Sequence, residues 1–304
     1  MMGQGAGRGT GLGFRLVCGA GVAAVIAAAC SGSPSKPSNG GNNGGGGGGV
    51  TNAAPVVKSI AVSDTRVEVG TPITLTATVE DAETPVASLS YAWTIPGGTV
   101  SGTGAAVSWT PGEDLVTPGD FTLKLTVTET YTSAGTQKQN TASGEVSVHV
   151  NNSPKELREL SLRFLGDFAN SKVSPEKCVS EFSNSCNGKK DELADIDDTR
   201  HDYEHIGSTL RHTSLSINAD RVRATVHTFC SFTVKVITTQ PRDEPCQNGK
   251  CPLGSVGSST GDCWTNNVYE NGRWWLCDSH FTPQRSLLAS PGTFTPTFFR
   301  RSRD

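Results

Sequence analysis

Hydrophobic residues follow two different periods along the chain. From Thr71 to Glu80, apolar residues alternate with threonines, which is the pattern of a half-buried β-strand. The stretch from Phe121 to Val127 repeats this alternation, and a last strand is expected from Gly144 to Val150. Because turns rich in glycine and proline separate these short strands, the pattern predicts an all-β sandwich over residues 54–151.

Helical periodicity follows at the start of residues 152–285. Ser153-Pro154-Lys155-Glu156 is a capping-box sequence with proline at the first helical position, so a helix is expected to begin there. Its apolar face consists of Leu157, Leu160, Phe164 and Phe168. Further helices are expected from Ser174 through Phe182 and from Lys189 to Ile206, the latter with a dense acidic face. The inward residues of that third helix are expected to be Leu193, Ile196, Tyr203 and Ile206.

After these helices, apolar and polar residues alternate again, which is the pattern of β-strands. A long strand is expected from Arg221 to Val236, with alternate residues from Val222 to Val234 on one face. Asn271-Gly272 predicts a tight turn between two further strands, Cys263 to Glu270 and Arg273 to Phe281. Helices followed by an antiparallel sheet indicate an α+β domain.

The two-residue turn also predicts the register of this hairpin. Its cross-strand pairs are Glu270 with Arg273, Val268 with Trp275, Asn266 with Cys277 and Trp264 with Ser279. In this register Trp264, Asn266, Trp275 and Cys277 share one face. If Trp275 points toward the helices, this face and Tyr203 line a candidate pocket, in which Asn266 is the clearest polar group. The alternative is that these side chains only pack a core.

The order of these elements resembles the nuclear transport factor 2-like (SnoaL-like) superfamily. The similar segments are the first helix through Phe168, the stretch from His212 to Val226 and the closing stretch from Asn271 to Asp278. The resemblance implies a cone of sheet packed on helices, with an inner pocket that some members use for isomerase or cyclase chemistry and many use only for binding. The long insert from Thr239 to Asp262 departs from the compact family pattern. No residue matches the catalytic carboxylate of the isomerase branch, so no catalytic residue is assigned.

The first domain has a resemblance of its own. Thr117 to Glu129 looks like the late-strand motif of a polycystic-kidney-disease (PKD) type immunoglobulin-like domain, and Tyr91-Ala92-Trp93 occupies the place of its core tryptophan strand. The W-D-F-G-D-G continuation of that family is replaced here by Thr94 to Gly98. The resemblance implies a spacer or adhesive module without catalytic residues, in which Trp93 and Trp109 are core side chains.

The amino-terminal segment has the pattern of a signal peptide. Arg8 and Arg15 precede an apolar run from Leu16 to Ala29, which is shorter than a membrane span needs. Ala28-Ala29-Cys30 resembles the lipobox of bacterial lipoproteins, although alanine replaces the usual leucine at residue 27. This resemblance implies removal of residues 1–29, acylation of Cys30 and the lipid bilayer as a partner. Ordinary secretion after an A-x-A site stays open, whereas lipidation of Cys18 and a retained membrane helix are less favoured.

Residues 30–53 are almost wholly serine, proline, asparagine and glycine, which predicts a disordered tether. For about 25 residues, the expected root-mean-square reach is on the order of 25 to 30 Å, enough to clear the lipid headgroups. Ser31 after the modified cysteine resembles the outer-membrane sorting pattern. We therefore expect an exported lipoprotein of the outer membrane or cell surface, with the periplasmic face left open. Residues 286–304 are expected to be a disordered tail.

Charge and cysteine content narrow the possible partners and the compartment. The formal net charge of −3 gives no indication of a nucleic-acid partner. Seven cysteines follow residue 152, which favours disulfides in an oxidising compartment and leaves at least one thiol unpaired. The preferred pairs are Cys178 with Cys186 and Cys246 with Cys251. A direct Cys263–Cys277 bond is excluded, because the predicted hairpin places these two residues on opposite faces.

One motif resembles the metal-binding sequence of some zinc proteases, but the match is too short to assign a metal site. His201-Asp202-Tyr203-Glu204-His205 spells H-x-x-E-H, which in some zinc proteases places two histidines and a glutamate on one helical face. A five-residue match is weak, and the surrounding acidic segment is more typical of a solvated helix. No metal site and no cofactor are assigned.

Taken together, the sequence predicts an exported, membrane-anchored module that binds a small ligand, an envelope protein or a glycan without catalysis. The β-sandwich would act as its spacer. Two alternatives stay open: an isomerase- or cyclase-like enzyme that uses the cone, and a structural protein of the cell envelope.

We predict that Cys30→Ala removes the lipid anchor. The variant loses its acyl label and leaves the membrane fraction, because no other thiol lies at the cleavage site. Metabolic labelling with a fatty-acid probe, together with fractionation, measures both effects. Unchanged label and unchanged membrane retention would contradict the lipoprotein interpretation.

Overall fold

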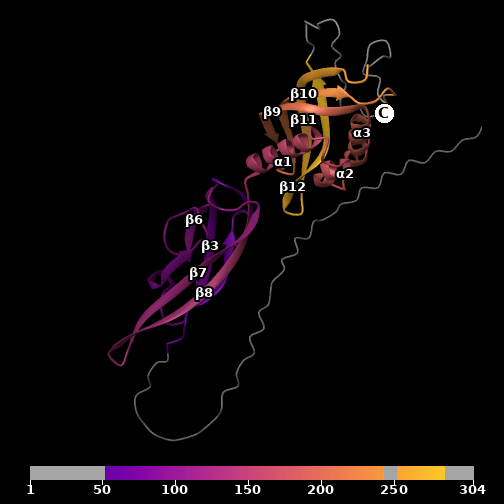
Figure 1. Ribbon diagram of the computed structural model, residues 1–304. Coiled ribbons are helices and arrows are strands. Elements are labelled where there is room, and N and C mark those ends of the chain that lie inside the picture. Colours follow the sequence, from indigo (N-terminus) through magenta and orange to yellow (C-terminus); the bar gives the residue numbers. More distant parts are fainter. Residues whose placement is uncertain (1–51, 241, 243–251, 285–304) are drawn as a thin grey trace, which may run out of the picture. The chain divides into compact units, whose positions relative to one another are not determined.

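The structure, a computed structural model, describes residues 52–240, 242 and 252–284 (Figure 1). The predictions for the signal peptide, Cys30, the tether and the tail therefore lie outside the described residues, as does the Cys246–Cys251 pair. Within the described ranges, no helix is both long enough and apolar enough to cross a membrane.

Two four-stranded sheets form the part of the chain up to Asn151. The first has the order β1 (Val56–Val62), β3 (Ile73–Glu80), β6 (Ala106–Thr110) and β5 (Thr99–Ser101). The second has the order β2 (Arg66–Glu68), β8 (Thr136–Asn151), β7 (Gly119–Ser133) and β4 (Ser90–Thr94). A short 3-10 helix, η1 (Val86–Ser88), precedes β4.

Both sheets contribute to one hydrophobic core. Leu75 and Trp109 from the first sheet and Leu123 from the second are fully buried in the same cluster, as alternation predicts. The Trp109 indole donates to the Gly97 carbonyl (2.9 Å), and the partly buried Trp93 indole donates to the Gly104 carbonyl (3.1 Å). The chain thus forms two β layers here, and membership of the PKD-type family stays a prediction.

The remainder of the described chain, which we call the cone domain, combines helices with one curled antiparallel sheet (Figure 1). The helices are α1 (Ser153–Phe168), α2 (Pro175–Cys178), the 3-10 helix η2 (Val179–Glu181) and α3 (Gly188–Asp202). The sheet has the order β12 (Arg273–Pro283), β11 (Val256–Glu270), β10 (Arg223–Val236) and β9 (Tyr203–Ile217). Helix α1 lies against this sheet and contacts β9, β10 and β12.

Helix α1 starts close to the predicted position, but its cap lies one residue earlier. The side chain of Asn152, not that of Ser153, accepts a hydrogen bond from the Lys155 backbone amide (3.3 Å). The Glu156 carboxylate accepts a hydrogen bond from the backbone N–H of Asn152 (2.6 Å). The reciprocal arrangement of a capping box is therefore present, with Asn152 as its first residue.

Helix α3 ends at Asp202, whereas the sequence predicts that it continues to Ile206. The chain turns into β9 at Tyr203, where Glu204 pairs with Lys235 of β10. Strand pairing thus replaces the last helical turn. As a result, Tyr203 is buried as predicted, but Ile206 is 51% exposed.

Apolar side chains of α1 fill the side of the sheet that faces the helices, which we call the concave side. Phe168 meets Phe232 of β10 edge-to-face at 5.4 Å, and Phe164 meets Phe182 at 5.1 Å. The hydroxyl of Thr265 on β11 contacts that of Ser161 on α1 (3.4 Å). The four phenylalanines belong to a single hydrophobic core, so α1 and the sheet pack directly against each other.

The disulfides of the cone domain differ from the preferred pair Cys178–Cys186. Cys186 bonds to Cys277, with a Cα–Cα separation of 5.1 Å, and Cys230 bonds to Cys263 at 5.9 Å. The Ser183 amide donates to the Leu276 carbonyl (2.8 Å), which brings the segment before α3 beside β12 and Cys186 beside Cys277. Cys178 remains a buried thiol and accepts a hydrogen bond from Arg200 (3.2 Å).

We predict that peptide mapping without reduction recovers the linked pairs Cys186–Cys277 and Cys230–Cys263. Cys178 should resist alkylation in the folded protein and react after denaturation, because its side chain is buried. A linked Cys178–Cys186 peptide would contradict this connectivity.

Candidate functional site

The sheet of the cone domain has a second face, opposite the concave side, which we call the outer face. Along β10 and β11 the side chains that alternate with the buried ones point to it, among them Thr225, His227, Trp264 and Asn266. Polar and aromatic side chains therefore lie in rows across neighbouring strands.

A β-bulge in β12 decides which residues of that strand reach the outer face. The predicted pairs Glu270–Arg273 and Val268–Trp275 are present. The register then shifts, so that Asn266 pairs with Asp278 and Trp264 pairs with His280. The predicted pairs Asn266–Cys277 and Trp264–Ser279 are wrong, because one extra residue of β12 is accommodated at Cys277.

The segment that precedes α3 passes close to this bulge. A side chain at Gly188 would place its Cβ only 2.2 Å from the Cys277 carbonyl oxygen, so only glycine fits at this position. Together with the Cys186–Cys277 bond, this contact fixes the start of α3 against β12.

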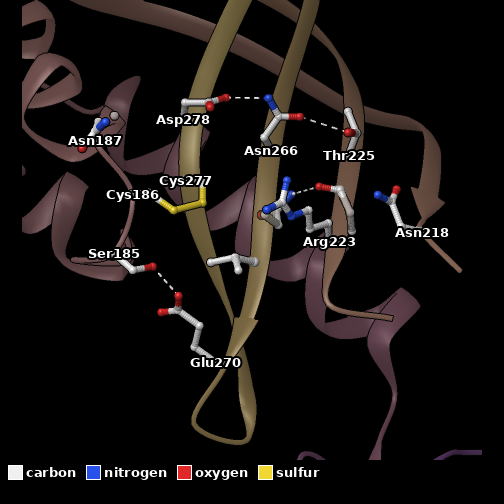
Figure 2. A pocket seen from close by; sticks show the side chains of 14 residues that line it. Ser185, Cys186, Asn187, Asn218, Arg223, Thr225, Asn266, Glu270, Cys277 and Asp278 are labelled. Carbon is white, nitrogen blue, oxygen red and sulfur yellow. Dashed lines mark hydrogen bonds between the residues drawn. A yellow bond between two sulfur atoms is a disulfide. The ribbon is translucent and has the colours of Figure 1, made fainter. Parts of the chain in front are cut away.

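A chain of hydrogen bonds crosses three strands on the outer face (Figure 2). The Thr225 hydroxyl donates to the side-chain oxygen of Asn266 (3.0 Å). The side-chain NH2 of Asn266 donates to the Asp278 carboxylate (2.7 Å). The His280 imidazole lies 3.1 Å from the same Asp278 oxygen. These bonds fix the orientation of the Asn266 amide.

This chain forms one wall of a cavity of about 700 Å³, which we call the outer pocket. Its polar lining side chains are Ser185, Asn187, Asn218, Arg223, Thr225, Asn266, Glu270 and Asp278. Ala224, Val268 and the Cys186–Cys277 disulfide add less polar surface. The volume lies within the range of small-molecule sites in proteins.

Two charged groups lie on opposite sides of the outer pocket (Figure 2). The Glu270 carboxylate accepts hydrogen bonds from the hydroxyls of Ser183 (2.7 Å) and Ser185, which lower the pKa of Glu270. The Arg223 side chain reaches across β11 from the other side. Among the described residues, Arg223 takes part in none of the ion pairs.

An aromatic row lies next to the outer pocket on the same face. Trp264 stacks between His227 and His280, with ring centroids 6.2 Å and 4.1 Å away. His227 also contacts the Asp262 carboxylate (2.7 Å). Trp264 therefore lies between two imidazoles from the neighbouring strands.

The structure distributes the five predicted pocket residues over different places. Asn266 and Cys277 line the outer pocket, and Trp264 lies in the adjacent aromatic row. Trp275 does not point toward the helices, because its neighbour Trp274 is the buried tryptophan of β12. The Arg273 guanidinium lies 3.7 Å from the centre of the Trp275 ring. Tyr203 belongs to the core of the concave side.

Sequence reasoning missed a buried carboxyl group on the concave side. Glu192 of α3 accepts a hydrogen bond from the Ser279 hydroxyl (2.6 Å), and burial raises the pKa of Glu192 to about 8. Its other carboxyl oxygen has no hydrogen-bond partner among the described residues. The signal was present, because Glu192 lies one helical turn before the inward Ile196.

The H-x-x-E-H motif does not form a metal site. His201 is the penultimate residue of α3, whereas Glu204 and His205 lie on opposite faces of β9. Burial, together with the charge of Arg200, lowers the pKa of His205 to about 4, and the imidazole packs against Phe168 at 4.9 Å. No group of three histidines, cysteines or carboxylates in the described ranges is suited to hold a metal ion.

Comparison with known protein families gives one partial match. Residues 109–250 match a family described as Msap1, mitotic spindle associated protein SHE1. This match covers less than half of the chain and extends from β6 beyond β10, so it defines neither domain. No curated protein matches the sequence.

Several solved structures resemble part of the chain. A conserved protein from Planctomyces limnophilus DSM 3776 is 14% identical, with 43% of this chain and 98% of that chain covered and a TM-score of 0.32. A protein of unknown function with a cystatin-like fold from Nostoc punctiforme is 17% identical, with 44% and 92% covered and a TM-score of 0.29. A type 2 hexachlorocyclohexane dehydrochlorinase is 11% identical, with 46% and 97% covered and a TM-score of 0.29.

A putative scytalone dehydratase from Novosphingobium aromaticivorans is 12% identical, with 49% of this chain and 99% of that chain covered and a TM-score of 0.31. At these identities the similarity concerns the fold alone.

We predict that Glu192→Gln makes folding stability less sensitive to pH between about pH 5 and 8. The pKa of Glu192 is about 8 in the folded state, well above its ordinary value, so between about pH 5 and 8 the folded state keeps a proton that the unfolded state has lost. The stability contributed by this group therefore falls as pH rises through that window, on the order of 1 kcal/mol per pH unit. Urea unfolding of both proteins from pH 5 to 8 measures the difference.

Glu270→Gln is the matched control, because hydrogen bonds lower the pKa of Glu270. The contribution of Glu270 is present above its ordinary pKa and is lost only on acidification. Identical pH slopes for the wild type and Glu192→Gln above pH 5 would show that Glu192 is not a buried neutral acid.

Proposed function

We propose that the chain is an exported lipoprotein whose cone domain binds a polar ligand in the outer pocket, without catalysis. The lipid on Cys30 and residues 30–53 would tether it to the membrane, with the two-sheet domain as a spacer. The two disulfides of the cone domain support an oxidising compartment.

The observation that carries this proposal is the ordered hydrogen-bond chain in the wall of the outer pocket. Thr225, Asn266 and Asp278 hold one another in fixed orientations before any ligand arrives. Side chains that are already ordered lose little conformational entropy on binding, which favours affinity.

The packing of the concave side counts against the isomerase- or cyclase-like alternative. The resemblance would place such chemistry among the side chains that face α1, and these belong to a continuous core. The titratable groups found there are buried by the same packing: Glu192 bonds to Ser279, and His205 packs on Phe168. We infer that these groups support the fold.

The proposal predicts a bound compound that depends on the outer pocket. The full chain, expressed in a bacterium with its export signal, should release a compound on denaturation that liquid chromatography with mass spectrometry detects. Asn266→Ala should lose most of this compound, because it removes the central amide of the hydrogen-bond chain.

Thr233→Val is the control, because Thr233 lies on the outer face of β10 away from the pocket and bonds to Ser258 (3.0 Å). It should retain the compound. Equal amounts from the wild type and Asn266→Ala, or no compound from either, would count against a binding function of the outer pocket.

A further inference from the structure

The outer pocket offers hydrogen-bond donors and acceptors in alternation. After the internal bonds are counted, Asn266 keeps a second N–H and Asp278 keeps a second carboxylate oxygen. The Thr225 oxygen keeps its lone pairs, and the Arg223 guanidinium offers several donors. A ligand that satisfies this lining must itself both donate and accept at closely spaced atoms.

The outer pocket carries charges of both signs, two carboxylates and one guanidinium. The carboxylates of Glu270 and Asp278 face one guanidinium, that of Arg223, so an anionic ligand would approach two negative charges. A cation would approach Arg223, which forms no ion pair among the described residues. A neutral ligand avoids both repulsions.

Hydroxyl groups on adjacent carbons meet both requirements. Each hydroxyl donates to a carboxylate or amide oxygen and accepts from an amide or guanidinium N–H. Val268 and the Cys186–Cys277 disulfide supply small apolar patches on the same lining, where the C–H groups of a sugar ring can pack. The volume of about 700 Å³ admits a short oligosaccharide.

We propose that the outer pocket binds a neutral saccharide. This inference rests on the proposed binding function and adds the chemical class of the ligand. Asn266 and Asp278 would bind vicinal hydroxyls, Arg223 would donate to ring or hydroxyl oxygens, and Val268 would contact the sugar ring.

A glycan array that displays neutral and anionic oligosaccharides tests the class with the full chain. Neutral oligosaccharides should be retained in preference to anionic ones. The strongest neutral oligosaccharide is then titrated into the wild type, Thr225→Val and Thr233→Val by isothermal titration calorimetry. Each variant replaces one outer-face threonine of β10 by a residue of the same shape that lacks the hydroxyl.

Thr225→Val should weaken binding by about threefold to tenfold, as expected for the loss of one neutral hydrogen-bonding group, and Thr233→Val should leave it unchanged. Asp278→Asn, which keeps the side-chain shape, should also weaken binding. Thermal melting checks that each variant is folded.

Retention of only anionic glycans, retention of none, or equal affinity of the wild type, Thr225→Val and Asp278→Asn overturns the saccharide assignment. If a compound without sugar is nevertheless released from the wild type and lost from Asn266→Ala, the binding function stands and only its ligand class is wrong. If no compound depends on Asn266, both proposals fail.

Discussion

The one extra residue that β12 accommodates at Cys277 determines the chemistry of both faces of the sheet in the cone domain. Without this bulge, Asp278 would alternate to the concave side and Ser279 would face outward. With it, Asp278 meets Asn266 on the outer face, and Ser279 turns inward to bond to Glu192. The bulge therefore places the carboxylate of Asp278 in the outer pocket and the hydroxyl of Ser279 beside the packed core.

The covalent and steric contacts at the bulge explain how it is held. Cys277 bonds to Cys186 just before α3, and Gly188 leaves room for the Cys277 carbonyl oxygen. Helix α3 is thereby fixed along β12, which places Glu192 within reach of Ser279. The outer pocket and the buried carboxyl group are thus two consequences of the same local geometry.

The sequence predicts local structure well where the pattern is local. The Asn271-Gly272 turn sets the first hairpin pairs, and the alternation of β10 gives the buried residues from Ala224 to Val234 correctly. The bulge has no such signature, because two adjacent outward residues in a half-polar edge strand leave the hydrophobic pattern nearly unchanged. The bulge therefore accounts for the two wrong pairs, Asn266–Cys277 and Trp264–Ser279. The placement of the Asn266 face is a separate matter, because it assumed an inward-pointing Trp275, whereas Trp274 is the buried residue.

Long-range contacts account for the remaining differences. The end of α3 at Asp202 depends on pairing between β9 and β10, which competes with the acidic helical pattern. The partner of Cys186 lies 91 residues away in the sequence and becomes its neighbour only after the segment before α3 bonds to β12. Neither contact can be read from spacing alone.

The central claim is that ligand binds at the outer face of the sheet and not on its concave side. Nuclear magnetic resonance tests this directly, by titrating the isotopically labelled full chain with the neutral oligosaccharide that the array selects. Binding in the outer pocket should produce chemical-shift changes centred on Thr225, Asn266 and Asp278. Changes centred instead on Phe164 and Phe232, in the core beneath α1, would contradict it.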